Sequence, residues 1–391
     1  MTGPDFPGDG VPPERLEPDA PAPAEATTDP DIAAAGDTDA AAGNAEAATE
    51  ADAAPEADDG ETEPDPDALP LDADGQPRLT LFGLSGRVVP AVYLVAWIAS
   101  ILGAGIITVS ILGSRNPFAR WLFVAGMGFL AIGLLAAAGS QALERGRRPS
   151  LPFRGPSPVL AFVVVVLVTL LATLVTLVPL SALGVDPGGP LGTTVSLAVT
   201  TLVFVAIVRL LVVGTGALSW SEIGFSRPPR GALADLATGA ALAVPVVIVE
   251  LIVLTLLAGF VGKPSSPLPP AGSVSALLFN LLSAAILAPL GEEVFFRGYT
   301  TTAWARAFGG RSAIIRGALF FSFAHIATLF ATSFSTGLSA AVAQYIALLP
   351  AGLALGWVFL QRRSIWASIG LHGTYNALIV LLAYAGTVAR G

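Results

Sequence analysis

Cysteine is absent from the chain, and histidine occurs only twice in 391 residues. Without cysteine, the chain has no disulfide, no thiolate nucleophile and no cysteine-based metal cluster. Charge is also scarce, since 13% of the residues are charged whereas 53% are hydrophobic. This balance excludes an ordinary soluble enzyme and is typical of a membrane protein.

The few charges are distributed unevenly. Residues 1–77 hold 22 of the 29 acidic residues and only one of the 20 basic residues, Arg15. The other 19 basic residues are spread between apolar runs, so they predict no basic surface for nucleic acid. We therefore expect the lipid bilayer as a partner and no nucleic acid.

Residues 1–80 are expected to form a disordered, acidic, Ala/Pro-rich cytoplasmic tail. Phe6 is the only aromatic residue before residue 78, and such a segment buries too little apolar surface to offset the entropy lost on ordering. The tail lacks the basic and apolar regions of a secretory signal, so we expect it to stay on the mature protein. We interpret it as a solvating or tethering arm.

Nine apolar stretches follow the tail, each near or above the roughly 20 residues that a helix needs to cross a bilayer. Their approximate limits are 88–113, 119–140, 157–184, 191–216, 232–261, 273–298, 312–334, 338–361 and 364–387. Because lipid offers backbone amides no partners, these runs predict an all-α polytopic membrane protein, a bundle of about nine transmembrane helices. We divide it into two N-terminal helices in residues 81–155 and a core in residues 156–391.

The basic residues between the helices predict the orientation. With the N-terminus inside, 12 of them lie on the cytoplasmic side and four, Arg115, Arg120, Lys263 and Arg390, lie on the other. Because cytoplasmic loops carry the excess of basic residues, we expect a multi-pass protein of the cell membrane with its N-terminus in the cytoplasm and its C-terminus outside.

Ionisable side chains inside a membrane are costly, so each is a candidate for function. The candidate catalytic residues in the last four stretches are Glu292, Glu293, Arg297, His325, His372 and Asn376. Polar residues that merely join helices would explain a single histidine. They explain less well two histidines together with paired glutamates.

The spacing of these residues gives each a direction. Glu293 and Arg297 are four residues apart, which places them on one helix face where they can pair. His372 and Asn376 have the same spacing and point the same way. Glu292 is turned by about 100° from Glu293 and is left for another partner. Pro289 removes a backbone amide and is expected to bend the helix and open a polar pocket.

Helix rise provides an independent test of convergence. At about 1.5 Å per residue, Glu292 lies about 10 Å before an expected helix end near Tyr299, and His325 and His372 lie about 12 to 13 Å into their helices. The three groups are therefore expected at one level in the cytoplasmic half of the bilayer. Such convergence is what an active site requires.

Three motifs in this order resemble the CAAX-processing and bacteriocin-processing (CPBP, or Abi) family of intramembrane proteases, which includes the type II CAAX prenyl endopeptidases. They are Glu-Glu-x-x-x-Arg (Glu292, Glu293, Arg297), Phe-x-x-x-His (Phe321, His325) and His-x-x-x-Asn (His372, Asn376). The resemblance is strongest over the last third of the chain, with the motifs inside residues 273–387.

The resemblance implies a peptidase that cleaves a peptide or membrane-protein substrate near the cytoplasmic membrane face. By this resemblance, Glu292 and His325 would activate a water, and His372 with Asn376 would stabilise the oxyanion. Glu293 and Arg297 would hold Glu292 in place.

Two questions stay open at this point. A hydrolytic zinc site is one alternative, because glutamate and histidine are common zinc ligands and Glu292, His325 and His372 could supply them. However, the zinc motif His-Glu-x-x-His is absent, and a Glu–His pair can activate water without a metal. Metal-free catalysis is therefore favoured over a zinc-dependent version. A non-catalytic immunity or scaffold protein of the same fold would be favoured by missing motif residues, and none is missing. A transporter would show two repeated halves, and we find no internal repeat.

The natural substrate is also open. Arginine is used in place of lysine and alanine is abundant, which suggests a GC-rich bacterial genome. Prenylated CAAX proteins are not expected in bacteria.

Overall fold

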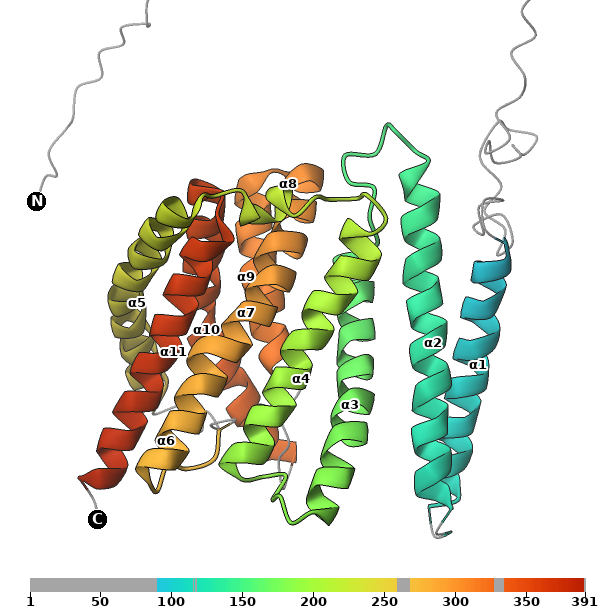
Figure 1. Cartoon of the computed structure of the whole chain (residues 1–391), viewed down its shortest axis with the longest axis horizontal. Coiled ribbons are helices and arrows are strands. Elements are labelled where there is room, and N and C mark those ends of the chain that lie inside the picture. The colour runs from blue at the N-terminus through green and yellow to red at the C-terminus, as the bar shows by residue number, and fades with distance from the viewer. Residues whose placement is uncertain (1–89, 115, 117, 259–267, 327–333, 390–391) are drawn as a thin grey trace, which may run out of the picture. The chain divides into compact units, whose positions relative to one another are not determined.

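The computed structural model describes residues 90–114, 116, 118–258, 268–326 and 334–389. Throughout these ranges the regular structure is helical and no strand occurs, which confirms the all-α class (Figure 1). The expected acidic tail lies outside the described residues.

The helices follow one another with short connections. The first part of the chain forms α1 (Pro90–Leu112), α2 (Ala119–Gly146), α3 (Pro158–Ala182), α4 (Pro190–Val208) with the π-helical η2 (Arg209–Val213), η3 (Ser221–Phe225) and α5 (Pro229–Leu257). The second part forms α6 (Val274–Leu281), η4 (Leu282–Leu287), α7 (Ala288–Glu293), η5 (Val294–Thr301), α8 (Thr302–Phe308), α9 (Gly310–Ile326), α10 (Phe334–Arg362) and α11 (Ile365–Val388). Proline at the first turn of α3, α4 and α5 suits a position whose amide has no helical partner.

Each of the nine predicted stretches contains a helix in the described part of the chain. Eight helices there are long and apolar enough to cross a membrane. The ninth, α9, has 17 described residues, and its last one, Ile326, borders residues that the structure does not describe. The multi-pass prediction is thus confirmed.

Large apolar side chains cover the outer faces of the helices. On α1, for example, Leu94, Ile98 and Ile101 are all more than half exposed. A soluble protein would bury such a surface, but in a bilayer it meets lipid at no cost. The exposed apolar faces therefore agree with the spans assigned from length and composition.

The sixth stretch differs from the expectation. A helix end near Tyr299 is wrong, because the helix continues through two π-helical segments from Val274 to Phe308. In the sequence, the polar residues after Phe296 suggest that the helix reaches the membrane surface there. In the structure, residues 297–301 are buried. The hydroxyl of Thr301 donates to the carbonyl of Phe296. Polarity there reflects contacts inside the protein.

An aromatic cluster between α3, α4, η5 and α9 forms the centre of the core. The ring of Phe296 lies 5.9 Å from that of Phe162 and 5.3 Å from that of Phe321. The hydroxyl of Tyr299, which is fully buried, donates to the carbonyl of Pro156 at 2.9 Å. The cluster fixes the helix turn that carries Glu293 and Arg297.

Candidate active site

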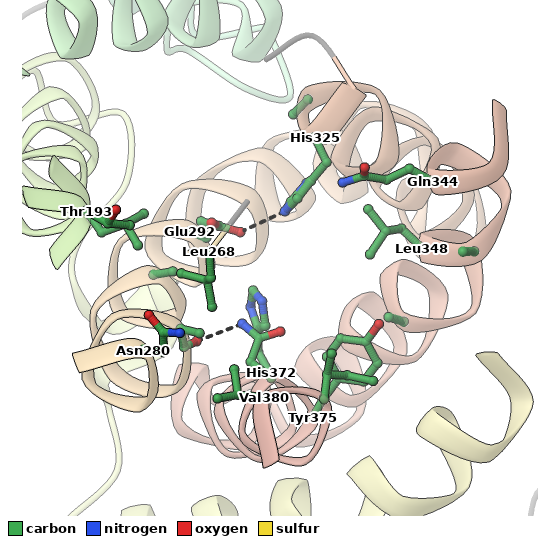
Figure 2. Close-up of a pocket in the computed structure, with 18 of the residues that line it drawn as sticks. Thr193, Leu268, Asn280, Glu292, His325, Gln344, Leu348, His372, Tyr375 and Val380 are labelled. Carbon is green, nitrogen blue, oxygen red and sulfur yellow. Dashed lines mark hydrogen bonds and ion pairs between the residues drawn. The ribbon is translucent and has the colours of Figure 1, made fainter. Parts of the chain in front are cut away.

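The first candidate pair joins the end of α7 to α9. Glu292 Oε2 lies 3.6 Å from His325 Nε2, which is too long for a direct strong hydrogen bond. Figure 2 shows the two side chains pointing toward each other at the edge of one opening. The side chains of Glu292 and His325 are 17% and 27% exposed and line a cavity, and Oε2 of Glu292 is itself buried without a hydrogen-bond partner.

His325 has a fixed ring orientation. Its Nδ1 lies 2.8 Å from the carbonyl oxygen of Phe321, one turn earlier on α9. A carbonyl only accepts, so Nδ1 carries the proton in this contact, and in a neutral ring Nε2 then presents a lone pair. Nε2 of a neutral His325 is therefore a hydrogen-bond acceptor that faces Glu292 and any molecule bound between the two side chains.

The second candidate pair is buried more deeply. Glu293 Oε1 accepts from His372 Nδ1 at 2.7 Å and lies 3.2 Å from Arg297 Nη1. The side chain of Glu293 is completely buried and that of Arg297 is 2% exposed. The predicted pairing of Glu293 with Arg297 is confirmed, and the hydrogen bond of Glu293 goes to His372, whereas the sequence suggested that it supports Glu292.

Phe321 stands between the charged groups. The guanidinium of Arg297 lies 4.2 Å from its ring centre, a cation–π distance. The same ring lies 4.4 Å from the ring of His325 and 5.7 Å from that of His372. The aromatic residue of the Phe-x-x-x-His motif thus contacts both histidines.

Asn376 is only partly available to a ligand. Its Nδ2 donates to the carbonyl of Ala284 at 2.7 Å, and Ala284 belongs to the π-helical η4. An amide nitrogen has two hydrogens, so one remains for another acceptor. Asn376 lines the same cavity as His372.

Two glycines let the site helices approach closely. A Cβ on Gly291 would come within 2.8 Å of the Cα of Thr201 on α4, and a Cβ on Gly373 within 2.5 Å of the carbonyl oxygen of Ala285. No side chain fits at such distances. The residues beside the glutamates and beside His372 are therefore small because the helix backbones touch.

A cavity of about 1270 Å³ connects these groups. It is lined by side chains from α3, α4, α5, α7, α9, α10 and α11, and the titratable or amide-bearing ones include Glu250, Glu292, His325, Gln344, His372 and Asn376. Figure 2 shows His372 beside the opening that Glu292 and His325 border. The cavity is mainly apolar, so it suits a hydrophobic chain with a few polar contacts.

The zinc alternative finds no preformed geometry. Within the described ranges, no three His, Cys, Asp or Glu side chains form a group that could hold a metal ion. Glu292, His325 and His372, the three ligands that the zinc alternative would use, all lie within these ranges and form no such group.

Tyr375 and Gln344 also line the cavity, and the reasoning from sequence missed both. The hydroxyl of Tyr375 contacts the carboxylate of Glu250 on α5, a helix far away along the chain. Gln344, on α10, has a buried Oε1 without a hydrogen-bond partner and lies near His325 in Figure 2. The depth of Glu250 in an apolar helix already indicated a place at the cavity, whereas no signal in the sequence pointed to Tyr375 or Gln344.

A multi-pass helical membrane protein with two carboxylate–histidine pairs at one cavity is the class that these observations define. Residues 274–378 match the model of a family described as type II CAAX prenyl endopeptidase Rce1-like. Neither the comparison with curated proteins nor that with solved structures gave a match. The resemblance is confirmed over this segment, which is similar to the CAAX-type intramembrane proteases.

Proposed function

We propose that this protein hydrolyses a peptide bond inside the membrane with a water molecule activated by Glu292 and His325. The observation that carries the proposal is the facing pair itself, Glu292 Oε2 and His325 Nε2 separated by 3.6 Å at a large apolar cavity. Two acceptors at this distance suit the two hydrogens of one water molecule. A water held in this way has its lone pairs directed toward the cavity.

The first chemical step forms a bond between the water oxygen and the carbonyl carbon of the substrate. Glu292 takes the water proton as the general base, while the carbonyl electron pair moves onto oxygen. In the second step the carbon–nitrogen bond breaks, and the proton held by Glu292 passes to the leaving amine. The products are a carboxylic acid, which keeps the second water hydrogen until it ionises, and an amine, and no covalent enzyme intermediate forms.

The oxyanion is stabilised by His372 Nε2 and the second amide hydrogen of Asn376. Because Nδ1 of His372 donates to Glu293, its Nε2 donates only if the ring is an imidazolium. Glu293 is placed to stabilise that imidazolium, and Arg297 and Phe321 hold Glu293 and the ring in position. Donors fixed in a site that excludes water favour a developing negative charge strongly.

The mechanism uses no metal ion, and the zinc-dependent version is its competitor. Glu292, His325 and His372 would be the ligands in that version, and bound zinc would supply a hydroxide at neutral pH. Chelation separates the two, because it should leave a metal-free protease active and should stop a zinc enzyme until zinc is added back.

The cleavage site is proposed to lie toward the cytoplasmic membrane face. The support is the 12-to-4 distribution of basic residues, which assigns that face to the connections after α2, η2, α8 and α10. His372 lies seven residues, or about 10 Å, after the start of α11 at this side.

Cleavage of quenched fluorescent peptides by the purified protein tests the proposal. Glu292→Gln keeps the shape of the side chain but removes the base, so it should slow cleavage by about 10²–10⁴-fold, the usual contribution of a general base. Glu144→Gln is the matched control, because Glu144 pairs with Arg148 at the end of α2, away from the cavity. Equal rates in all three proteins would reject the mechanism, and no cleavage by wild type would favour a non-catalytic scaffold.

A further inference from the structure

A second carboxylate enters the cavity away from the proposed catalytic pair. Glu250 lies on α5, seven residues before its end at Leu257, and is 7% exposed. It lines the same cavity as Glu292 and His372. The proposed hydrolysis gives Glu250 no task.

Within the described chain, the carboxylate of Glu250 has one hydrogen-bond partner, the hydroxyl of Tyr375, which donates to Oε2. Tyr375 lies on α11 between His372 and Asn376 and borders the opening in Figure 2. One hydrogen bond thus joins Glu250 to the turn that carries the proposed oxyanion donors. The other carboxylate oxygen, Oε1, is left for a ligand.

No lysine or arginine side chain of the described cavity lining balances Glu250. Among its lining residues in the described ranges, two are glutamates, two are histidines and none is a lysine or an arginine. The nearby Arg297 is buried against Glu293 and Phe321 and does not line the cavity. Glu250 therefore differs from Glu293, whose charge is paired within the protein.

A carboxylate in an apolar site is costly when a phenol is its only partner. A cationic group entering the cavity would add a charge-assisted hydrogen bond to the free oxygen, and such bonds are about twice as strong as neutral ones. The apolar walls would at the same time accept the hydrocarbon chain that carries the cation.

We propose that Glu250, held by Tyr375, is the binding site for a cationic side chain of the substrate. This inference rests on the proposed function for the identity of its ligand, a membrane peptide that is apolar apart from a lysine or an arginine. The same charge pattern disfavours a peptide that brings a carboxylate into the cavity.

Binding of three labelled peptides to the Glu292→Gln protein tests this site without requiring cleavage. Each peptide has about 20 Leu and Ala residues, enough to cross a bilayer, with blocked ends and one central Lys, Gln or Glu. In this variant Glu292 is neutral, so it does not cause any preference for charge. We expect the Lys peptide to bind about tenfold or more tightly than the Gln peptide, as one charge-assisted hydrogen bond implies, and the Glu peptide to bind weakest.

Three second substitutions in the same background identify the source of the preference. Glu250→Gln should bring the ratio of Lys to Gln affinities close to one. Tyr375→Phe removes the hydroxyl but keeps the carboxylate, so the ratio should stay high. Glu144→Gln changes a carboxylate outside the cavity and should also leave the ratio high.

Equal affinities for the three peptides would overturn the proposal, as would binding of none of them or a ratio that survives Glu250→Gln. The comparison of three peptides on one protein holds even if the Glu250→Gln variant fails to fold. A wild-type protein that prefers the Lys peptide but cleaves nothing would contradict the protease mechanism and leave this site intact. Cleavage without any charge preference would contradict the cation site at Glu250 and leave the protease mechanism intact.

Discussion

Replacing Glu293 by Gln tests the buried charge network that underlies the site. Glu293 is completely buried and faces two positive or polarised partners, Arg297 and His372. The amide of Gln keeps the shape and can still accept from His372, but it has no charge. The guanidinium of Arg297, 2% exposed, would then be buried without its counter-charge.

The size of the effect follows from that burial. Removing one partner of a buried ion pair costs about 3–5 kcal/mol, because the remaining charge is not solvated. Since domains are stable by only about 5–15 kcal/mol, this is a large share of the total. By contrast, Glu144→Gln breaks a surface pair whose side chains are 29% and 47% exposed, and such pairs contribute at most about 1 kcal/mol.

The double variant Glu293→Gln with Arg297→Met removes the orphaned charge. Methionine has a similar length and no charge, and buried ion pairs can be replaced by apolar residues at little cost. We therefore expect the double variant to regain most of the lost stability. Peptidase activity should not return, because His372 still lacks the carboxylate that accepts from its Nδ1.

Unfolding by denaturing detergent, followed through the fluorescence of the six tryptophans, provides the measurement. The reasoning would be refuted by a Glu293→Gln protein within about 1 kcal/mol of wild type, the range of an exposed pair. It would equally fail if the double variant were less stable than the single one.

Three other predictions concern parts outside the cavity. Hydrogen bonds from Ser219, above all from its backbone N–H, together with Arg306, hold the pKa of Glu222 below its ordinary value of 4.5. Its stabilisation is therefore present above the unfolded-state pKa and is lost as the pH falls through the folded-state pKa, so thermal unfolding between about pH 5 and 3 should depend less on pH in Glu222→Gln. A phosphatase fused after Gly391 should be active outside the cytoplasm, and an inactive fusion would contradict the predicted orientation. Deleting residues 1–77 should leave thermal stability and activity unchanged, and loss of membrane insertion would disprove this.

Much of the helical organisation could be predicted from sequence because lipid imposes a simple rule on length and composition. The same rule misplaced the end of the sixth stretch near Tyr299. Arg297 pairs with the buried Glu293, and Thr301 donates to the carbonyl of Phe296, so both are polar and yet buried. One sequence does not distinguish such residues from exposed ones.

The site shows a similar division. Four-residue spacing predicts contacts within a helix, so it correctly paired Glu293 with Arg297. It carries no information on contacts between helices, so the hydrogen bond from His372 to Glu293 was not foreseen. The contact of Tyr375 with Glu250 joins α11 to α5 and was hidden for the same reason.

Isotope transfer from labelled water tests the central claim most directly. Purified protein is incubated with the Lys peptide in ¹⁸O-water, and the new carboxyl terminus is analysed by mass spectrometry. If Glu292 activates water for hydrolysis, wild type yields a product carrying ¹⁸O, and Glu292→Gln yields about 10²–10⁴-fold less in the same time. Labelled product formed by Glu292→Gln at the wild-type rate would contradict the account.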